Sequence, residues 1–559
     1  MESSIKGIEV PPYIMKREPK RYRYDIVVIG SGPNGLALAA YLSKAGARVL
    51  ILEKCFESGG GLATEDLTIP GFVHNSHSVY HMMVDYAPPY RDFKLEEDYD
   101  VHYVYPDLQF AMPLRDGKCI CIHRDIEKTC ASLKVFSKRD AEAWREIAYK
   151  SQNFVEDYLA PATYVAAVPT LEQAALFQKS EFGRALMAYA EKSPRDIVDE
   201  LFENEHVKAL MAYIICQWGI EYDQNGLGYL ALLFLNRSTH YRLCVRGSHR
   251  VASALTRVIL ENGGEMRNSV VIKQIIVENG TAVGVEMDDG TIYEAGKAVV
   301  SSIDPQQTFL KMMDREALDR DFAEMIEGWM WEKWSLLTTH LAIDGRPDFA
   351  AASSDPEIKE AFVYVLGYET VEDLIDHWKA IERGEIMKGA GFNCCFPSIH
   401  DPVQASEGRS SGLISQMAPY RLRSGMDKWY DRNFREELVQ GCIDTLEEYA
   451  PGIRDKILWT SVSTPKDIEN KFPDMVQGSF KQGAYHPFQM GYNRPNSECS
   501  HHQTPIGNLY LCGASAHSGG MVTFGPGYIA ANRIAEDLGM KKWWDEPEMI
   551  TKARKKGIL

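Results

Sequence analysis

The chain has 559 residues, of which 45% are hydrophobic and 25% charged, as in a globular protein with a large core. Its formal net charge of −17 disfavours nucleic acid as a partner, because phosphate binding needs a basic surface. No apolar run approaches the roughly 20 residues that span a bilayer, and the N-terminal segment has no signal-peptide core. With eleven irregularly spaced cysteines, we expect a reduced, cytoplasmic protein.

A glycine-rich turn follows the first predicted strand, which covers residues 24–29. A small-residue helix is predicted to reach about residue 45, and a second strand over 48–52 ends at Glu53. This strand–turn–helix–strand context is the dinucleotide-binding fingerprint, and Glu53 is placed to accept hydrogen bonds from a ribose. The turn itself is Gly30-Ser31-Gly32-Pro33-Asn34-Gly35.

Each glycine of the turn has its own expected role. Gly30 permits the tight turn, Gly32 lets a pyrophosphate approach the backbone, and Gly35 lets the helix pack closely on the strand. The helix N-terminus then offers free N–H groups to the phosphates. The cofactor contacts predicted here therefore include Gly30, Gly32, Pro33, Asn34 and Gly35.

A second glycine cluster follows the acid directly, and it points to the class of dinucleotide. Its sequence GGGLATEDLTIPGFVHNSHSVYH resembles the FAD-binding amine oxidase and phytoene desaturase superfamily. The match is closest to the phytoene-dehydrogenase-like branch, which includes the pyridine nucleotide-disulfide oxidoreductase domain 2 proteins. The resemblance implies FAD as the cofactor, with Arg in many relatives where this chain has Gly61. It adds to the predicted site the residues Lys54, Gly60, Gly61 and Leu62.

Residues 245–308 form a second block that matches the same superfamily. A helix is predicted to end at Asn262-Gly263-Gly264, and strands follow with turns at Asn279-Gly280 and Asp289-Gly290. The resemblance implies that Val270 lies in an inserted strand and meets the adenine with its backbone. The chain should then return to the nucleotide domain near Ser301-Ser302.

A third block, GASAHSGGMVTFGPGYIAANRI, lies between a predicted strand at 509–513 and a predicted helix at 527–538. Five glycines in its first fifteen positions suggest that a flat group lies against the main chain. In the resembled family this loop runs along the isoalloxazine ring, and its N–H groups reach the pyrimidine edge. The positions that match are Gly513, Gly519, Gly520, Met521 and Val522.

The resemblance implies an α/β fold: a Rossmann-like FAD-binding domain of the GR2, or amine oxidase, type with a discontinuous mixed α+β substrate domain. The FAD-binding domain is expected over 21–90, 241–308 and 495–541, and the substrate domain over 91–240 and 309–494. Within the substrate domain, segments 201–222 and 322–343 show helix-like periodicity. Residues 1–20 and 542–559 are expected to be terminal tails.

The predicted function is FAD-dependent desaturation of a C–C bond in an apolar, isoprenoid-like or cyclic substrate, with hydride transfer to flavin N5. Electrons would pass to oxygen, a quinone or a carrier protein. A flavin amine oxidase and an isomerase with no net redox change are the alternatives. The intact glycines disfavour a GDI-like escort protein, and the lack of a CxxC pair disfavours a disulfide reductase.

A proton acceptor is needed beside the leaving hydride, and the sequence offers several. We select His517 in the closing loop, Tyr485 just before it, and His77 after the second glycine cluster. A structural hydrogen-bonding role competes with catalysis for each of them. His77 also has metal-ligand spacing with His74 and His81, but no carboxylate pattern accompanies them, and no metal is predicted.

Both ends of the chain are basic against the acidic average. A basic edge beside Trp543-Trp544 could rest on an anionic membrane, which would suit a lipid-derived substrate. A solvated tail, or a contact in a homo- or hetero-oligomer, is the favoured interpretation. The basic residues are Lys16, Arg17, Lys20, Arg21, Arg23, Lys552, Arg554, Lys555 and Lys556.

Overall fold

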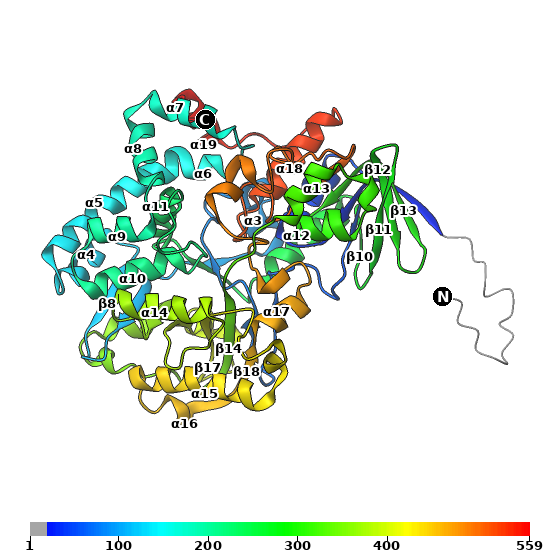
Figure 1. The fold of residues 1–559 in the computed structure, drawn as a ribbon. Helices are drawn as coiled ribbons and strands as arrows, with labels where there is room; N and C mark the ends of the chain where they lie inside the picture. The colour runs from blue at the N-terminus through cyan, green and yellow to red at the C-terminus, as the bar shows by residue number, and fades with distance from the viewer. Residues whose placement is uncertain (1–19) are drawn as a thin grey trace, which may run out of the picture.

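The computed structural model describes residues 20–559, so the expected N-terminal tail, with Lys16 and Arg17, lies almost entirely outside the described residues. Two large sheets organise the described chain, with a layer of helices beside them (Figure 1). Among the described residues, no helix combines the length and apolarity needed to cross a membrane.

The first sheet has a parallel centre built from all three blocks of the sequence. Its central strand β1 (Arg21–Ile29) lies between β2 (Val49–Leu52) and β13 (Ile292–Ser301), and β10 (Glu265–Arg267) extends it beyond β2. The last strand, β19 (Leu509–Leu511), pairs with the final residues of β13. Every residue of β2 is buried, as expected for a parallel strand covered on both faces.

A hairpin of β11 (Ile272–Glu278) and β12 (Thr281–Met287) continues the sheet along the first half of β13. Asn279 and Gly280 both have positive φ, which the tight turn between two antiparallel strands requires. Val270 lies in the loop between β10 and β11, so the strand expected at this residue is not formed. The loop occurs because the chain must turn from a parallel strand into the antiparallel hairpin.

Three helices cover the parallel strands. Helix α1 (Pro33–Lys44) packs against α12 (His249–Glu261) and α18 (Gly525–Asp537). The sequence LALAAYL keeps α1 narrow and buried. At its N-terminus, a Cβ added to Gly527 of α18 would lie 2.3 Å from the Asn34 carbonyl oxygen. Glycine is therefore needed where the closing helix crosses the fingerprint.

The second sheet belongs to the spacer regions and is mainly antiparallel; only β15 and β7 run parallel. Its strands in order are β18 (Ile457–Ser463), β14 (Ser335–Asp344), β17 (Arg409–Ala418), β16 (Phe392–Cys395), β15 (Val363–Leu366), β7 (Leu108–Pro113) and β8 (Cys119–His123). Along β15 the side chains alternate: Tyr364 and Leu366 face α15 (Arg432–Tyr449), whereas Val363 and Val365 face the helical layer.

The helical periodicity expected over 322–343 is wrong in its second half. Helix α13 (Arg320–Glu327) is present, but the segment continues as strand β14. Nearly all of β14 is buried, so it carries apolar residues on both faces and lacks the alternation that would identify a strand.

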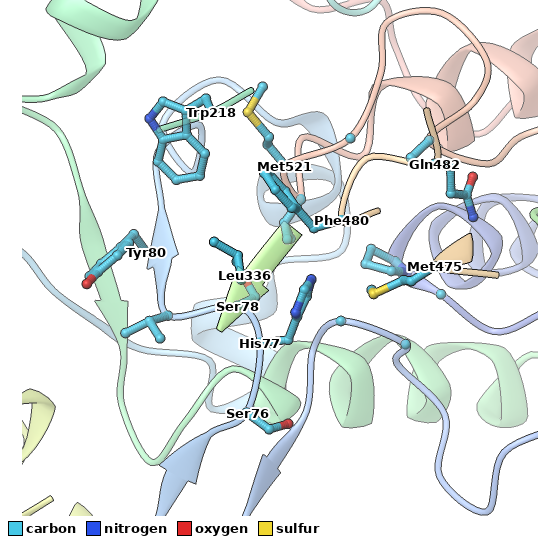
Figure 2. A pocket seen from close by; sticks show the side chains of 18 of the residues that line it. Ser76, His77, Ser78, Tyr80, Trp218, Leu336, Met475, Phe480, Gln482 and Met521 are labelled. Atoms are coloured by element: carbon cyan, nitrogen blue, oxygen red, sulfur yellow. The ribbon is translucent and has the colours of Figure 1, made fainter. Parts of the chain in front are cut away.

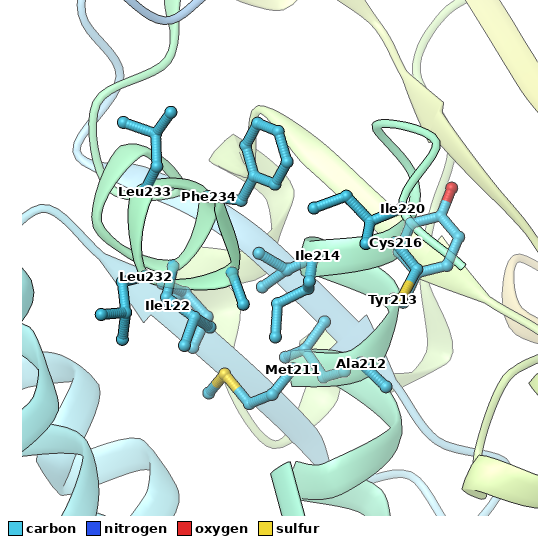
Figure 3. Close-up of a cluster of buried hydrophobic side chains, with 14 of the residues drawn as sticks. Ile122, Met211, Ala212, Tyr213, Ile214, Cys216, Ile220, Leu232, Leu233 and Phe234 are labelled. Atoms are coloured by element: carbon cyan, nitrogen blue, oxygen red, sulfur yellow. The ribbon is translucent and has the colours of Figure 1, made fainter. Parts of the chain in front are cut away.

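The helical layer surrounds α10 (Glu205–Cys216) and α11 (Gly228–Arg237), whose side chains are buried around most of their circumference. Met211, Ile214 and Phe234 meet Ile122 of β8 in this core (Figure 3). The remaining helices of the layer are α4 (Ile126–Lys134), α5 (Lys138–Phe154), α7 (Thr170–Gln178), α8 (Glu181–Ala190), α9 (Pro194–Leu201) and α14 (Val371–Glu382), with the short α6 (Ala160–Ala162) following a π-helical turn η2 (Val155–Leu159).

Residues 542–559, expected as a tail, are packed on the protein. Trp543 donates its indole N–H to the Tyr41 carbonyl oxygen over 3.1 Å, and Trp544 is buried. Helix α19 (Glu548–Lys555) then buries Ile550 and Ala553 against α6 and η2. The tryptophans therefore pack against the protein interior and do not present a membrane-facing edge.

Candidate active site

The turn between β1 and α1 keeps one glycine open and closes another. Gly30 has φ +87°, in the left-handed region. A Cβ at Gly35 would lie 2.4 Å from the Gly30 carbonyl oxygen, whereas a Cβ at Gly32 would have no atom within 4 Å. Gly32 is also the N-cap of α1, and no side chain caps that helix. Its first N–H groups are thus free to meet an anion.

Glu53 is fixed at the carboxyl end of β2 by the same turn. Its carboxylate accepts hydrogen bonds from the Ser31 N–H at 2.8 Å and the Ser31 hydroxyl at 2.7 Å. Val270 donates its N–H to the Glu53 carbonyl oxygen at 3.0 Å. This backbone donor is therefore already engaged within the protein. Lys54 is exposed and Leu62 is fully buried, so neither side chain lines the cavity described below.

The second glycine cluster lies directly over the first. A Cβ at Gly60 would be 3.2 Å from the Gly32 Cα, and a Cβ at Gly61 would be 2.9 Å from the His77 ring. His77 thus stands beside the position where many relatives carry arginine. Burial, together with nearby Lys471, lowers the pKa of His77 to about 4, so the ring is neutral at neutral pH.

The glycine-rich loop of the third block has an unusual backbone. Met521, Val522 and Phe524 all have φ between 53° and 68°, a conformation that is rare for a β-branched residue such as valine. The loop is held from outside: the Gly520 N–H donates to the Tyr485 hydroxyl at 3.2 Å. Strained backbone of this kind persists where the surrounding structure fixes it, and it clusters at functional sites.

Arg494 holds the segment that leads into this loop. Its side chain is fully buried and donates to the carbonyl oxygens of Ala514 at 3.0 Å and Lys481 at 2.9 Å. Gly513, one of the predicted cofactor contacts, packs against the backbone: its Cβ would lie 2.4 Å from the Ser302 carbonyl oxygen. Gly513 therefore serves the close packing of β19 on β13.

A cavity of about 1340 Å³ joins these elements. It is lined at one end by the fingerprint from Gly32 to Gly35 with Gly60 and Gly61, and elsewhere by Gly520, Met521 and Val522. The rest of the wall is aromatic and aliphatic, and His77 projects into the space between Leu336 and Met475 (Figure 2). The side chains that sequence reasoning missed in this wall are Tyr80, Trp218, Leu336, Leu413, Met475 and Phe480.

Asp474 is a second missed residue type in the cavity, a buried acid. Burial raises its pKa to about 6, although Gln482 donates a hydrogen bond to it at 2.7 Å. The negative charges of Glu53 and Asp304 act in the same direction as burial. No sequence motif marks Asp474, since it lies in an irregular segment between α17 (Pro465–Lys471) and the closing loop.

The other predicted acceptors lie elsewhere. Tyr485 and His517 line a separate cavity, and the His517 Nε2 atom lies 3.2 Å from the Ala162 carbonyl oxygen. His74 and His81 are buried in the short strands β4 (His74–Asn75) and β5 (Tyr80–His81). Each pairs with its own hydroxyl, the first with Thr68 at 2.8 Å and the second with Tyr103 at 2.7 Å.

The residues present fit a dinucleotide that carries a flat ring system. An uncapped helix N-terminus with an open glycine suits a pyrophosphate, and the acid at the end of β2 suits a ribose. A loop with glycine at 519 and 520 leaves room for a planar group against its main chain. The apolar remainder of the cavity would exclude water from that group.

Comparison with known proteins supports the same assignment. Residues 28–93 match the family model of an NAD(P)-binding Rossmann-like domain. One of the limonene dehydrogenase chains of Castellaniella defragrans is 38% identical over 550 residues, covering 96% of this chain and 98% of its own. A lycopene-forming phytoene desaturase of Pseudescherichia vulneris is 24% identical, covering 92% and 98%.

A solved oxidoreductase of Methanosarcina mazei has the same fold, with a TM-score of 0.59 and 18% identity over 92% of this chain and all of its own. The predicted fold class, a Rossmann-like α/β domain joined to a mixed α+β region, is therefore confirmed. The predicted resemblance to the phytoene desaturase superfamily is confirmed as well.

Proposed function

The chain belongs to the phytoene desaturase-like superfamily of flavin-dependent oxidoreductases, and from this membership we propose that it is an FAD-dependent dehydrogenase. Its proposed reaction is the desaturation of a carbon–carbon bond in an apolar, isoprenoid-like or cyclic molecule. The observation that carries the proposal is the single cavity that unites the glycine-rich fingerprint, the strained loop at 520–522 and an apolar wall.

FAD would be held by groups with complementary chemistry. The free N–H groups of α1 and the open face of Gly32 would take the pyrophosphate, and Glu53 would accept from a ribose. Met521 and Val522 would lie along the isoalloxazine, since they line the cavity and their backbone is already fixed. FAD bound here would accept a hydride at N5 while the adjacent carbon loses a proton, so that a C=C bond forms.

The substrate is proposed from the cavity wall and from the relatives' names. Trp218, Leu336 and Phe480 offer apolar surface, which suits a hydrocarbon and gives no partner to a cationic amine. Limonene and phytoene, the molecules named for two relatives, are both isoprenoid hydrocarbons. The electrons would finally pass to oxygen, a quinone or a carrier protein.

His77 is the proposed proton acceptor. It is neutral at neutral pH, and its ring projects into the cavity from beside Gly61. A weak base is sufficient, because loss of a hydride makes the neighbouring C–H strongly acidic. Tyr485 is proposed to position the loop, since its hydroxyl is bound to the Gly520 N–H outside this cavity.

The experiment is an anaerobic titration of the purified protein, followed by its absorption spectrum. A flavin band at about 450 nm should appear in the protein and bleach when a cyclic or acyclic isoprenoid hydrocarbon is added, but not when an amine is added. The same additions to free FAD serve as the control. Product analysis should find one new C=C bond per bleached flavin, and readmitted oxygen or an added quinone should restore the band.

Three outcomes would overturn the proposal. Conversion of the substrate into an isomer without bleaching would make the protein an isomerase. Bleaching by amines but not by hydrocarbons would make it an amine oxidase. Absence of any bound flavin after FAD is added would remove both enzyme assignments.

A further inference from the structure

A second cavity, of about 1970 Å³, lies in the helical layer and is not used by the site described above. Its wall is formed by α6, α7, α8 and α11 together with the end of the chain, where Figure 1 places α19 and the C-terminus beside these helices. Aliphatic and aromatic side chains dominate the wall, among them Met83, Leu159, Phe177, Leu186, Leu230 and Leu233.

The two cavities meet at the strained loop. Gly520 and Met521 line both of them, so only this backbone and one flexible thioether side chain separate the spaces. Tyr485, whose hydroxyl accepts from the Gly520 N–H, lies on the side of the second cavity. A molecule in the second cavity would therefore lie next to the loop that borders the proposed flavin.

The last two residues of the chain form part of the outer wall. Helix α19 ends in a cap: Gly557 has φ +69°, and the Ile558 N–H donates back to the Ala553 carbonyl oxygen at 3.3 Å. This reversal turns Ile558 and Leu559 toward the cavity that they line, and Ile558 is only 4% exposed. Lys556 ties the turn to η2 through Asp157 at 2.6 Å.

The charge of the cavity also restricts its ligand. Arg554 is the one charged side chain among the described lining residues, and its charge is paired with Glu546. Two highly exposed apolar side chains stand next to lining residues: Leu171 follows Thr170 and is 86% exposed, and Phe488 follows Pro487 and is 79% exposed. An uncharged apolar molecule would thus meet apolar surface outside the cavity as well as within it.

From these observations we propose that the second cavity is a binding compartment for an uncharged isoprenoid-like hydrocarbon, which passes Met521 to reach the flavin, and that Ile558 and Leu559 close its outer side. The identity of the ligand rests on the proposed function. The existence of the compartment does not, because it follows from the lining residues and the packed C-terminus.

The test measures apolar binding separately from flavin chemistry. Nile red, an uncharged fluorescent dye, is titrated into the full-length protein, and a cyclic monoterpene hydrocarbon is then used to displace it. Leu233→Trp fills the compartment from α11, and Leu260→Trp, at a half-exposed site on α12, is the matched control. Leu559→Asp is a second variant at the chain end, where overpacking cannot prevent folding.

We expect Leu233→Trp to weaken dye binding by about tenfold or more, since an indole takes the space of the ligand. Leu559→Asp should weaken it by about fivefold, because a carboxylate would face an apolar ligand. Flavin content and the flavin spectrum should match those of Leu260→Trp. Among active variants, the KM for the hydrocarbon should rise with the dye Kd while kcat changes little.

Wild-type dye affinity in both Leu233→Trp and Leu559→Asp would overturn the compartment. So would failure of the hydrocarbon to displace the dye. Loss of dye binding in these variants, in a protein whose flavin never bleaches, would keep the compartment and reject the proposed function instead.

Discussion

The hydroxyl of Ser302 donates to the carbonyl oxygen of Gly30 over 2.9 Å and so joins the end of β13 to the fingerprint turn. The same hydroxyl lies 2.9 Å from the carbonyl oxygen of Ile29. A Cβ at Gly30 would approach the Ser302 oxygen to 2.7 Å, and one at Gly35 would approach it to 3.0 Å. Glycine is thus required at 30 and 35 by the protein itself, whereas Gly32 borders only open space.

This difference gives the first prediction. Gly32→Ala should fold with unchanged or slightly higher stability, because its φ of −62° suits alanine and its Cβ would meet no atom. It should nevertheless lower FAD affinity by about tenfold or more, since the methyl group would occupy the path of the pyrophosphate. Calorimetric FAD titration and thermal unfolding of the flavin-free protein measure the two effects.

Gly35→Ala is the contrasting variant. Its Cβ would lie 2.4 Å from a backbone oxygen that cannot move freely, so the flavin-free protein should lose about 2 kcal/mol or more. Equal loss of FAD affinity and of stability in both variants would contradict the distinction drawn between the two glycines.

A second prediction concerns Tyr485. Phenylalanine at this position removes the acceptor of the Gly520 N–H but keeps the ring, so the variant should lose about 1 kcal/mol of stability. If Tyr485 positions the loop, kcat should fall by less than about tenfold and its pH profile should be unchanged. A fall of several orders of magnitude with loss of one limb of the pH profile would make Tyr485 the proton-transfer residue.

A third prediction concerns His77. His77→Asn keeps a polar side chain beside Gly61 but removes the ring nitrogen that would accept a proton. We expect kcat to fall by about 100-fold while flavin content stays normal, the usual size of a lost general base. The matched control is His517→Asn, which alters a histidine of the second cavity. A larger loss in the control than in His77→Asn would reassign the acceptor.

The parts of the fold predicted from sequence are those governed by local backbone requirements. The fingerprint turn, the hairpin turn at Asn279-Gly280 and the closing loop all need φ values that glycine or asparagine supplies, and those residues mark them in the sequence. The parallel strands β1 and β2 are continuous apolar runs beside such turns, so they too could be recognised.

The cavity wall could not be predicted in the same way. Tyr80, Trp218, Leu336 and Phe480 come from four distant segments, and apolar residues of these types fill the core throughout the chain. Only the second sheet and the helical layer bring them together, and β14 itself was hidden by its burial on both faces. Asp474 carries no local signal either, because its raised pKa arises from tertiary burial.

A fourth prediction is loss of stability in acid. Burial lowers the pKa of His74, His81 and His377 from 6.5 to about 4. The unfolded chain therefore takes up these protons first, and each histidine removes about 3 kcal/mol of stability as pH falls from 6.5 to 4. Asp474 acts oppositely, since its pKa is raised, but it restores only about 3 kcal/mol over the same range.

The histidines outweigh the single acid, so the flavin-free protein should unfold before pH reaches about 4, given a total stability of about 5–15 kcal/mol. Tryptophan fluorescence against pH measures the midpoint. His377→Gln, which cannot take up a proton and can still pair with the Tyr368 hydroxyl, should move the midpoint to lower pH. An acid midpoint that is unchanged in this variant would exclude His377 from the effect.

The last prediction concerns a buried ion pair beside the closing loop. Lys481 and Glu332 lie 3.1 Å apart with side chains 0% and 3% exposed, and their charged atoms have no well-oriented hydrogen bond among the described residues. Burial of this kind makes each charge depend on the other. Glu332→Gln or Lys481→Met alone should cost about 3–5 kcal/mol, because one uncompensated charge remains in an apolar setting. The double variant Glu332→Leu with Lys481→Met should recover most of that loss, since neither charge remains. Urea unfolding of the four proteins gives the coupling energy, and strictly additive losses would show that the two residues do not act as a pair. Because the Lys481 backbone lies against Gly520, with its Cα 3.3 Å from a Cβ built there, the single variants should also loosen the flavin loop. A shift of the bound-flavin spectrum in the single variants, but not in the double variant, would separate this effect from a general loss of stability.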